Sequence, residues 1–281
     1  MIVNLKEILN LAEGGQYAIG AYNTPNLESL MAVLGAAEDR NVPVIIMHAQ
    51  VHEEIVPIEA VGPVMVSAAR KSSVPVCVHL DHGEDLDYIR KGLELGFTSV
   101  MYDGSGLSYE ENVQNTLKAK WMAGQYGAGV EAEIGVVGGR EAGLGENAED
   151  LYTDPTNAKK FVEDTEIDAL ACSFGTAHGF YQSAPKLDFE RINQIRKLTS
   201  LPLVMHGGSG VLPEDYVKSI ACGVRKINYY SYMSRAGVEG AKKFLQSDNP
   251  AYYHDLVLAA RISMTENILE SMKVFYQNCN L

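Results

Sequence analysis

Short apolar runs alternate with amphipathic stretches of helical period along most of the chain, and this alternation restricts the fold more than any other feature. Eight runs rich in Val, Ile, Leu and Ala predict strands, at residues 17–23, 44–48, 76–80, 99–102, 129–134, 169–173, 203–206 and 226–229. A helix is expected after each strand, at residues 27–40, 57–71, 86–95, 109–126, 155–165, 188–198, 213–221 and 231–246. Strands that alternate with helices form a parallel sheet, so we predict an α/β fold, a (β/α)8 TIM barrel.

Two more helices are expected outside the repeating units, an N-terminal one at residues 5–14 and a C-terminal extension at about residues 252–277. Helix starts carry capping residues, such as Asn26, and Ser108 with Glu111 three positions later. A TIM barrel commonly takes about 250 residues. The chain has 281 residues and no linker or low-complexity tract, so we predict one barrel domain over residues 1–281.

The composition is that of a water-soluble protein. Hydrophobic residues make up 46% of the chain, and no apolar run approaches the roughly 18 residues of a membrane span. The four cysteines lie far apart and the first residues lack a secretory pattern, so we expect a cytoplasmic protein. The net charge of −13 argues against a nucleic-acid partner, because phosphate backbones are bound by clustered Lys and Arg.

Three predicted strands end near a histidine that is followed by glycine: His82, His178 and His206. The carboxyl ends of barrel strands meet at one face, where barrel enzymes have their active sites, so we expect the three side chains to lie together. Three neutral imidazoles with an open fourth position form a catalytic Zn²⁺ site. The alternative, three unrelated hydrogen-bonded histidines, is disfavoured by their shared position at strand ends. His79 lies earlier on its strand and is expected to be a hydrogen-bonded core residue.

Asp81 precedes His82 and is the candidate for proton transfer. A neighbouring metal ion would favour the ionised carboxylate, which could then exchange a proton with a substrate hydroxyl. The alternative is a plain strand-end carboxylate. Because adjacent residues of a strand face opposite sides, Asp81 and His82 can serve one site only if the strand ends or turns at His82.

Residues 207–210 (Gly-Gly-Ser-Gly) and 228–231 (Asn-Tyr-Tyr-Ser) follow the last two strands, where barrels often bind phosphate through backbone N–H groups. A tight loop without a ligand is the alternative. Residues 131–146 are rich in glycine and carboxylates, and we expect a mobile loop that presents Glu141 to a substrate. The alternative there is a solvated acidic loop. Glu133, near the strand tip, is a candidate partner of the metal ligands or an occasional ligand itself.

Five motifs occur along the chain in this order: residues 79–83 (His-Leu-Asp-His-Gly), 99–105 (Ser-Val-Met-Tyr-Asp-Gly-Ser), 131–135 (Glu-Ala-Glu-Ile-Gly), 175–179 (Gly-Thr-Ala-His-Gly) and 206–210 (His-Gly-Gly-Ser-Gly). Together they resemble the class II, metal-dependent fructose/tagatose-bisphosphate aldolase family, and the similarity covers nearly the whole chain. Residues 152–155 (Tyr-Thr-Asp-Pro) and 183–189 (Ser-Ala-Pro-Lys-Leu-Asp-Phe) look closest to the tagatose-bisphosphate aldolase branch.

The resemblance implies reversible aldol cleavage of a ketose phosphate, such as fructose or tagatose 1,6-bisphosphate. The products would be dihydroxyacetone phosphate and an aldehyde such as glyceraldehyde 3-phosphate. By matched position, one Zn²⁺ would be held by His82, His178 and His206. Asp81 would handle the proton of the C4 hydroxyl, and Glu141 the proton on the dihydroxyacetone phosphate carbon.

The resemblance also implies a substrate site, with a monovalent cation (Na⁺ or K⁺) assisting the phosphate, and a homodimer or homotetramer. Asn23 matches a substrate-side residue of the family. The residues matched to phosphate binding follow strands six, seven and eight, and they are Gly179, Gly207, Ser209, Asn228 and Ser231.

The chain departs from the family pattern at three positions on the substrate side. Tyr230 stands where an acidic or small residue is frequent, Gln182 stands where many relatives have lysine, and His48 is unusual after the second strand. These three are therefore candidate specificity residues. They leave open which aldehyde is released and whether it carries a second phosphate.

Other functions stay open from the sequence alone, among them an aldolase for a different ketose 1-phosphate and a non-catalytic sugar-phosphate-binding subunit. A binding subunit needs no proton-transfer residue, so the presence of Asp81 and Glu141 argues against it. A Schiff-base aldolase would need a desolvated lysine at a strand tip, whereas Lys226 is expected at the start of the eighth strand.

Overall fold

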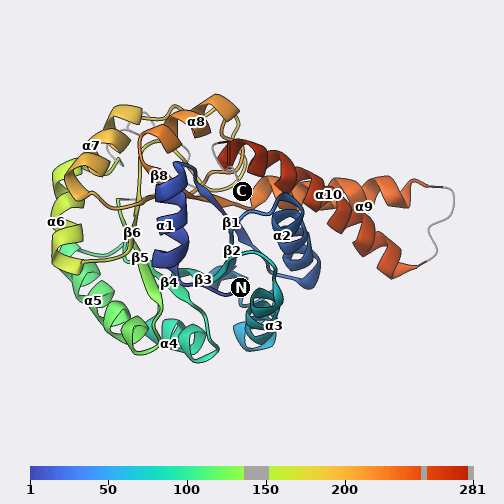
Figure 1. Cartoon of the computed structure of the whole chain (residues 1–281), viewed down its shortest axis with the longest axis horizontal. Coiled ribbons are helices and arrows are strands. Elements are labelled where there is room, and N and C mark those ends of the chain that lie inside the picture. The colour runs from blue at the N-terminus through green and yellow to red at the C-terminus, as the bar shows by residue number, and fades with distance from the viewer. Residues whose placement is uncertain (136–151, 248–251, 278–281) are drawn as a thin grey trace.

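The computed structural model describes residues 1–135, 152–247 and 252–277. Eight parallel strands close into a barrel in chain order, and β1 pairs with β8 to complete it (Figure 1). The strands are β1 (Ile19–Asn23), β2 (Val44–Ala49), β3 (Val76–Gly83), β4 (Ser99–Tyr102), β5 (Gly129–Ile134), β6 (Ala169–Cys172), β7 (Leu203–Met205) and β8 (Val224–Tyr229).

Helices follow the strands and surround the barrel, which confirms the predicted TIM barrel (Figure 1). They are α1 (Leu5–Gly15), α2 (Leu27–Arg40), the short 3-10 helix η1 (Gln50–His52), α3 (Ile58–Lys71), α4 (Leu86–Glu94), α5 (Tyr109–Gln125), α6 (Pro155–Thr165), α7 (Phe189–Thr199), α8 (Pro213–Ala221), α9 (Ser231–Leu245) and α10 (Tyr253–Phe275). Asn26 caps α2, and Ser108 forms the predicted capping box with Glu111 at the start of α5.

The strands are buried along nearly their whole length. All six residues of β2 are buried, for example, because one face of the strand points into the barrel and the other lies under helices. This double burial explains why the strands appear in the sequence as continuous apolar runs rather than as alternating ones. Polar side chains at strand ends are exceptions to this rule, and they mark the site.

Helix α1 covers the barrel at the amino-terminal ends of the strands. Its residues Leu5, Ile8 and Leu9 are buried, and the segment before it pairs with the start of β3 through a bridge between Ile2 and Val76. One end of the barrel is thereby closed with apolar side chains. The carboxyl end is left for the site.

Helices α9 and α10 pack against each other and project from the barrel as a hairpin (Figure 1). Gly237 and Gly240 permit the close approach, since a Cβ at Gly240 would lie 2.4 Å from Ser263 Oγ. Apolar side chains of the hairpin, including Leu258 and Ile262, are exposed. Within the described ranges no helix combines the length and apolarity needed to cross a membrane.

Two strands extend by two or more residues beyond their expected bounds. We expected the third strand to end at Leu80, but β3 continues to Gly83, with a register shift against β4 after Leu80. The eighth strand begins at Val224, two residues before the expected Lys226, so Lys226 lies inside the strand and the barrel. In both cases a polar side chain interrupts the apolar run while the backbone ladder continues.

Candidate active site

His82, His178 and His206 converge at the carboxyl ends of the strands. The ring centroids of His82 and His206 are 4.6 Å apart, and that of His178 lies 5.1 Å and 5.8 Å from them. One nitrogen from each ring lies within 4.8 Å of the others, and Nε2 of His82 is 2.9 Å from Nδ1 of His206. The structure thus brings the three predicted metal ligands together.

The backbone at His82 explains how two consecutive residues reach one site. His82 has a φ of 47°, in the left-handed region that few residues other than glycine adopt. This turn breaks the alternation of the strand, so that Asp81 Oδ1 lies 4.0 Å from His82 Nε2. The condition that the sequence set for Asp81 and His82 is therefore met. Such a conformation costs about 1 kcal/mol or more, which surrounding contacts must offset.

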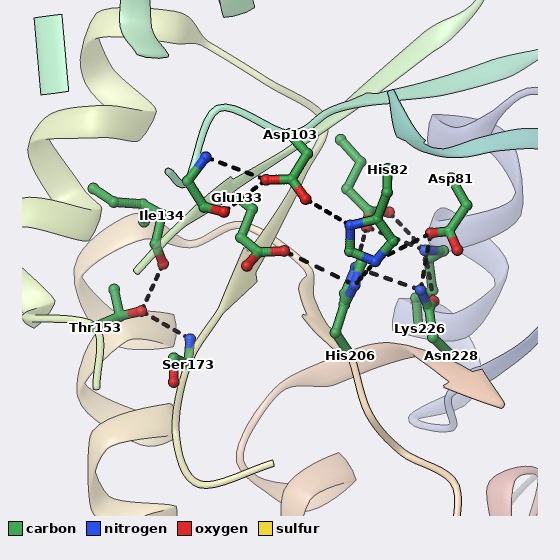
Figure 2. A network of polar contacts seen from close by, with 12 residues as sticks. Asp81, His82, Asp103, Glu133, Ile134, Thr153, Ser173, His206, Lys226 and Asn228 are labelled. Atoms are coloured by element: carbon green, nitrogen blue, oxygen red, sulfur yellow. Dashed lines mark hydrogen bonds and ion pairs between the residues drawn. The ribbon is translucent and has the colours of Figure 1, made fainter. Parts of the chain in front are cut away.

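Carboxylates form hydrogen bonds to two of the imidazoles, and Figure 2 shows the contact of Asp103 with His82. Asp103 Oδ2 lies 2.6 Å from His82 Nδ1, and Glu131 Oε1 lies 2.9 Å from His206 Nε2. Each carboxylate accepts a hydrogen bond from the ring N–H that faces it, which in a neutral ring leaves the other nitrogen with its lone pair directed towards the centre of the cluster. Ser105 Oγ in turn donates to Asp103 at 2.7 Å.

Lys226 balances the charge of Glu131 inside the barrel. Its Nζ lies 2.8 Å from Glu131 Oε2, and both side chains are fully buried. Burial alone would raise the pKa of the Glu131 carboxyl, but the ammonium of Lys226 outweighs burial and lowers this pKa to about 2. Glu131 is therefore an anion that can orient His206. Lys226 does not line the cavity, and it lies within β8 rather than at its tip.

The imidazoles differ in their affinity for protons. Burial lowers the pKa of His178 to about 3 and also lowers the pKa of His206, so both rings are neutral near pH 7. Burial opposes protonation of His82 too, but the charge of Asp81 and the hydrogen bond to Asp103 outweigh it and raise this pKa to about 10. The negative charges of Asp81 and Asp103 therefore favour positive charge beside His82.

Asp81 is buried and accepts two hydrogen bonds from amides. Asn23 Nδ2 donates to its Oδ2 at 3.0 Å, and Asn228 Nδ2 donates to its Oδ1 at 3.1 Å. Burial would raise the pKa of Asp81, but the neighbouring imidazoles of His82 and His206 hold it well below its ordinary value. Asp81 is therefore a fixed carboxylate beside the three imidazoles.

A cavity of about 370 Å³ lies at this face of the barrel. Most of the residues predicted for the site lie on its wall: Asn23, Asp81, His82, Glu133, His178, Gly179, Gly207, Ser209, Asn228, Tyr230 and Ser231. Glu133 Oε2 is 3.9 Å from His206 Nδ1, and Glu133 also forms a possible cation-binding group with His82 and Asp103. His206 does not line the cavity itself, but it contacts His82 and Glu133, which do.

The loop after β7 is shaped for backbone contact. Gly207 has a φ of 62°, and a Cβ there would lie 2.3 Å from the carbonyl oxygen of Ala177, so only glycine fits. Ser209 Oγ accepts the backbone N–H of Tyr230 at 2.8 Å, which ties this loop to the start of α9. Helix α9 begins at Ser231, and its free N–H groups are suited to an anion.

Two predicted residues lie away from the cavity, and a third is not among the described residues. His48 is fully buried behind the cavity, where its Nε2 is 3.1 Å from the hydroxyl of Tyr88. Gln182 is exposed and does not line the cavity. Glu141 falls outside the described residues. His79 is the buried, hydrogen-bonded residue that we expected, with Nδ1 2.6 Å from Ser99 Oγ.

The sequence interpretation missed the roles of Asp103, Glu131 and Lys226. Asp103 follows β4 and precedes a serine by two positions, as expected for a carboxylate that a neighbouring hydroxyl orients. Glu131 and Lys226 are charged residues in buried strands that also carry Glu133 and Arg225. A buried charge requires a partner of opposite sign, so the sequence indicates a buried ion pair but does not determine which of these residues form it.

A parallel barrel with three imidazoles and a carboxylate at its carboxyl face has a candidate metal site where barrel enzymes have their active sites. The family profile described as "Fructose-bisphosphate aldolase class-II" matches residues 3–279. The chain therefore belongs to the class II fructose-bisphosphate aldolase family, whose members are lyases.

Similar proteins include one named sulfofructosephosphate aldolase from Alkalicoccus urumqiensis, 39% identical over 273 residues that cover 96% of this chain and 95% of the relative. A probable fructose-bisphosphate aldolase of Bacillus subtilis is 37% identical over 279 residues, 98% of this chain and 97% of the relative. The crystal structure of the YdjI aldolase from Escherichia coli K12 superposes with a TM-score of 0.88 at 35% identity, covering 98% of this chain and 97% of that one.

Proposed function

We propose that the protein is a Zn²⁺-dependent aldolase that reversibly cleaves a ketose phosphate, of the fructose or tagatose 1,6-bisphosphate type, to dihydroxyacetone phosphate and an aldehyde such as glyceraldehyde 3-phosphate. The convergence of three imidazole nitrogens beside the buried Asp81 is the observation that carries this proposal. The relatives named fructose-bisphosphate aldolase and sulfofructosephosphate aldolase support a phosphorylated ketose.

The residues present fit a zinc ion. His82, His178 and His206 offer three nitrogen ligands, and the carboxylates of Asp103 and Glu131 hold the far nitrogens of two rings, as is usual for histidines that bind metals. When bound, Zn²⁺ would act as a Lewis acid that stabilises negative charge on the oxygen atoms of the three-carbon half.

Asp81 and Glu141 would move the two protons of the reaction. In cleavage, Asp81 takes the proton of the C4 hydroxyl, the C3–C4 bond breaks, and its electron pair stays on the three-carbon half. Glu141 then gives a proton to C3, which becomes the hydroxymethyl carbon of dihydroxyacetone phosphate. The hydrogen bonds from Asn23 and Asn228 orient Asp81 for its step.

The loops after β6, β7 and β8 would bind the substrate phosphate. Gly179, Gly207, Ser209, Asn228 and Ser231 all line the cavity. The N-terminus of α9 adds N–H groups there, and a monovalent cation (Na⁺ or K⁺) would offset further charge.

Specificity for the aldehyde half would involve Tyr230 directly and His48 and Gln182 indirectly. Tyr230 lines the cavity, whereas His48 supports the segment after β2 from behind. The exposed Gln182 lies in the loop that follows His178 and Gly179. The tagatose-like features of the sequence stay a prediction.

We propose further that residues 1–281 act as one domain in a cytoplasmic homodimer or homotetramer. The exposed apolar side chains of the projecting α9–α10 hairpin, such as Leu258 and Ile262, support an interface between copies of the chain.

Metal removal tests the proposed function. The protein is stripped with a chelator and restored with Zn²⁺, and cleavage is measured with fructose and tagatose 1,6-bisphosphate and with ketose 1-phosphates. We expect cleavage to disappear and return with the metal. Cleavage that survives complete metal removal would refute the proposal, and borohydride trapping with substrate would then test a Schiff-base mechanism.

A further inference from the structure

Two aromatic side chains, those of His52 and Tyr230, contribute to the wall of the cavity. His52 is in η1, directly after β2, and Tyr230 precedes α9. Their ring centroids are 5.3 Å apart with an angle of 55° between the planes. Both residues line the cavity together with Ala49 and Val51.

His52 has hydrogen-bonding capacity that the described residues do not use. Only 7% of the residue is exposed, and its Nδ1 has no hydrogen-bond partner within the described residues. His48, four residues earlier, also leaves Nδ1 without a partner there, but its Nε2 pairs with Tyr88 and the residue does not line the cavity. A buried polar group that is left without a partner is unfavourable, so a hydrogen bond from a ligand hydroxyl would stabilise this ring.

The position of His52 relates it to the bond that breaks. Ala49 lies opposite Asp81 in the pairing of β2 with β3, and His52 follows three residues later. The two side chains are close enough for the charge of Asp81 to favour protonation of His52, although burial outweighs this and lowers the pKa of the ring. His52 is therefore a neutral imidazole, suited to a hydroxyl group rather than to an ion pair.

We propose that His52 determines specificity for the aldehyde half of the substrate by a hydrogen bond between its imidazole and the C5 hydroxyl of the ketose phosphate, with the ring of Tyr230 packed beside the same carbon. This rests on the proposed function, in which Asp81 handles the C4 hydroxyl. The carbon chain of the substrate would continue from C4 past Asp81. His52 is the next polar side chain on the β2 side of the cavity. The ligand class is a hydroxylated carbon chain, with or without a terminal phosphate.

Condensation of dihydroxyacetone phosphate with paired aldehydes tests this directly. The C2 hydroxyl of glyceraldehyde becomes the C5 hydroxyl of the ketose, and 3-hydroxypropanal lacks it. The pair is used with and without a terminal phosphate on the full-length, Zn²⁺-loaded protein. We expect the wild type to prefer the hydroxylated aldehyde in kcat/KM by roughly threefold to tenfold, the range of one hydrogen bond between neutral groups.

Two substitutions separate the hydrogen bond from the shape of the ring. His52→Phe keeps an aromatic ring without nitrogen, and we expect the preference to fall to about 1 because no hydrogen bond remains. His52→Gln keeps a hydrogen-bonding group and is expected to retain part of the preference. His254→Phe changes an exposed histidine and is the matched control, with the wild-type preference.

Exchange of a hydroxymethyl hydrogen of dihydroxyacetone phosphate with solvent, measured without aldehyde, is the internal reference. Condensation rates are divided by this exchange rate, which removes effects on folding or metal content. The proposal on His52 is wrong if exchange proceeds but the wild type shows no preference, or if His52→Phe keeps it. Absence of metal-dependent exchange and cleavage in the wild type would instead refute the proposed function, and the role of His52 with it.

Discussion

The two histidine-bearing sides of the cavity are held in different ways. On the side of β3 and β7, His82 and His206 each have a carboxylate behind them, Asp103 and Glu131, at 2.6 Å and 2.9 Å. On the side of β2, the segment of His48 and His52 leaves Nδ1 of both rings without a partner within the described residues.

This difference indicates that the side chains on the β3 and β7 side are oriented more firmly than those on the β2 side. The paired imidazoles are oriented before any ligand arrives, as a metal site requires, because ligand geometry must match a fixed coordination. In the proposed function, the side of β2 would contact the aldehyde half of the substrate. Substitutions on the two sides should therefore have different consequences.

Asp81→Asn is expected to have the largest effect on the β3 side. Removing the proton acceptor should lower kcat for cleavage by about 10²–10⁴-fold. The Asn23 amide can turn to pair with the new amide, since its Oδ1 has no partner within the described residues, so the fold should persist. Bound zinc and the exchange of the dihydroxyacetone phosphate hydrogen are measured beside cleavage. Equal loss of exchange and cleavage would contradict a role confined to the C4 hydroxyl.

Lys226→Met tests the buried ion pair with Glu131, the carboxylate that contacts His206. Glu131 would lose its buried ammonium partner, and we expect the free energy of unfolding to fall by about 3–5 kcal/mol. Denaturant unfolding measures this. Lys120→Met, which removes a surface pair with Glu166, should cost at most about 1 kcal/mol. Adding Glu131→Gln to Lys226→Met should recover part of the loss, and an unchanged midpoint in Lys226→Met would contradict the pairing.

Asp103→Asn tests the orientation of His82. The amide cannot supply the negative charge that His82 Nδ1 faces, so zinc affinity should fall by about 10–100-fold. Competition with a chromophoric chelator measures it. Asp87→Asn, at an exposed carboxylate paired with Arg90, is the control and should leave zinc affinity unchanged. A wild-type affinity in Asp103→Asn would show that the two sides of the cavity do not differ as described.

Tyr88→Phe should have the smallest effect and acts only on the β2 side. The hydroxyl of Tyr88 is the partner of His48 and donates to Glu53 Oε2 at 2.6 Å. Its loss should lower the free energy of unfolding by about 1–2 kcal/mol and leave zinc affinity unchanged, since no metal-side residue is touched. Tyr109→Phe, whose hydroxyl donates to Asp164 near the surface, is the matched control with a smaller loss. A fall in zinc affinity would show that the β2 side and the metal-binding side are energetically coupled.

Much of the barrel followed from the sequence because each element carries its own pattern. Buried parallel strands are apolar on both faces, so β2 and the other strands stand out, and Asn26 and Ser108 mark helix starts through caps that act within four residues. The predicted end of β3 and the predicted start of β8 were wrong because polar residues interrupt the apolar pattern on which the prediction depends. Asp81 and Lys226 break the apolar pattern while remaining in the ladder.

The sequence by itself determined which residues could form the site: histidines beside glycines at strand ends, with Asp81 next to one of them. Only the tertiary structure decided which of them meet. His52 and His48 are similar in sequence context, yet one lines the cavity and the other lies behind it. Side-chain direction depends on the backbone turn at His82, on closure of the barrel and on partners such as Glu131 and Lys226 from distant strands. Local pattern carries none of that information, because these contacts form only when the whole barrel closes.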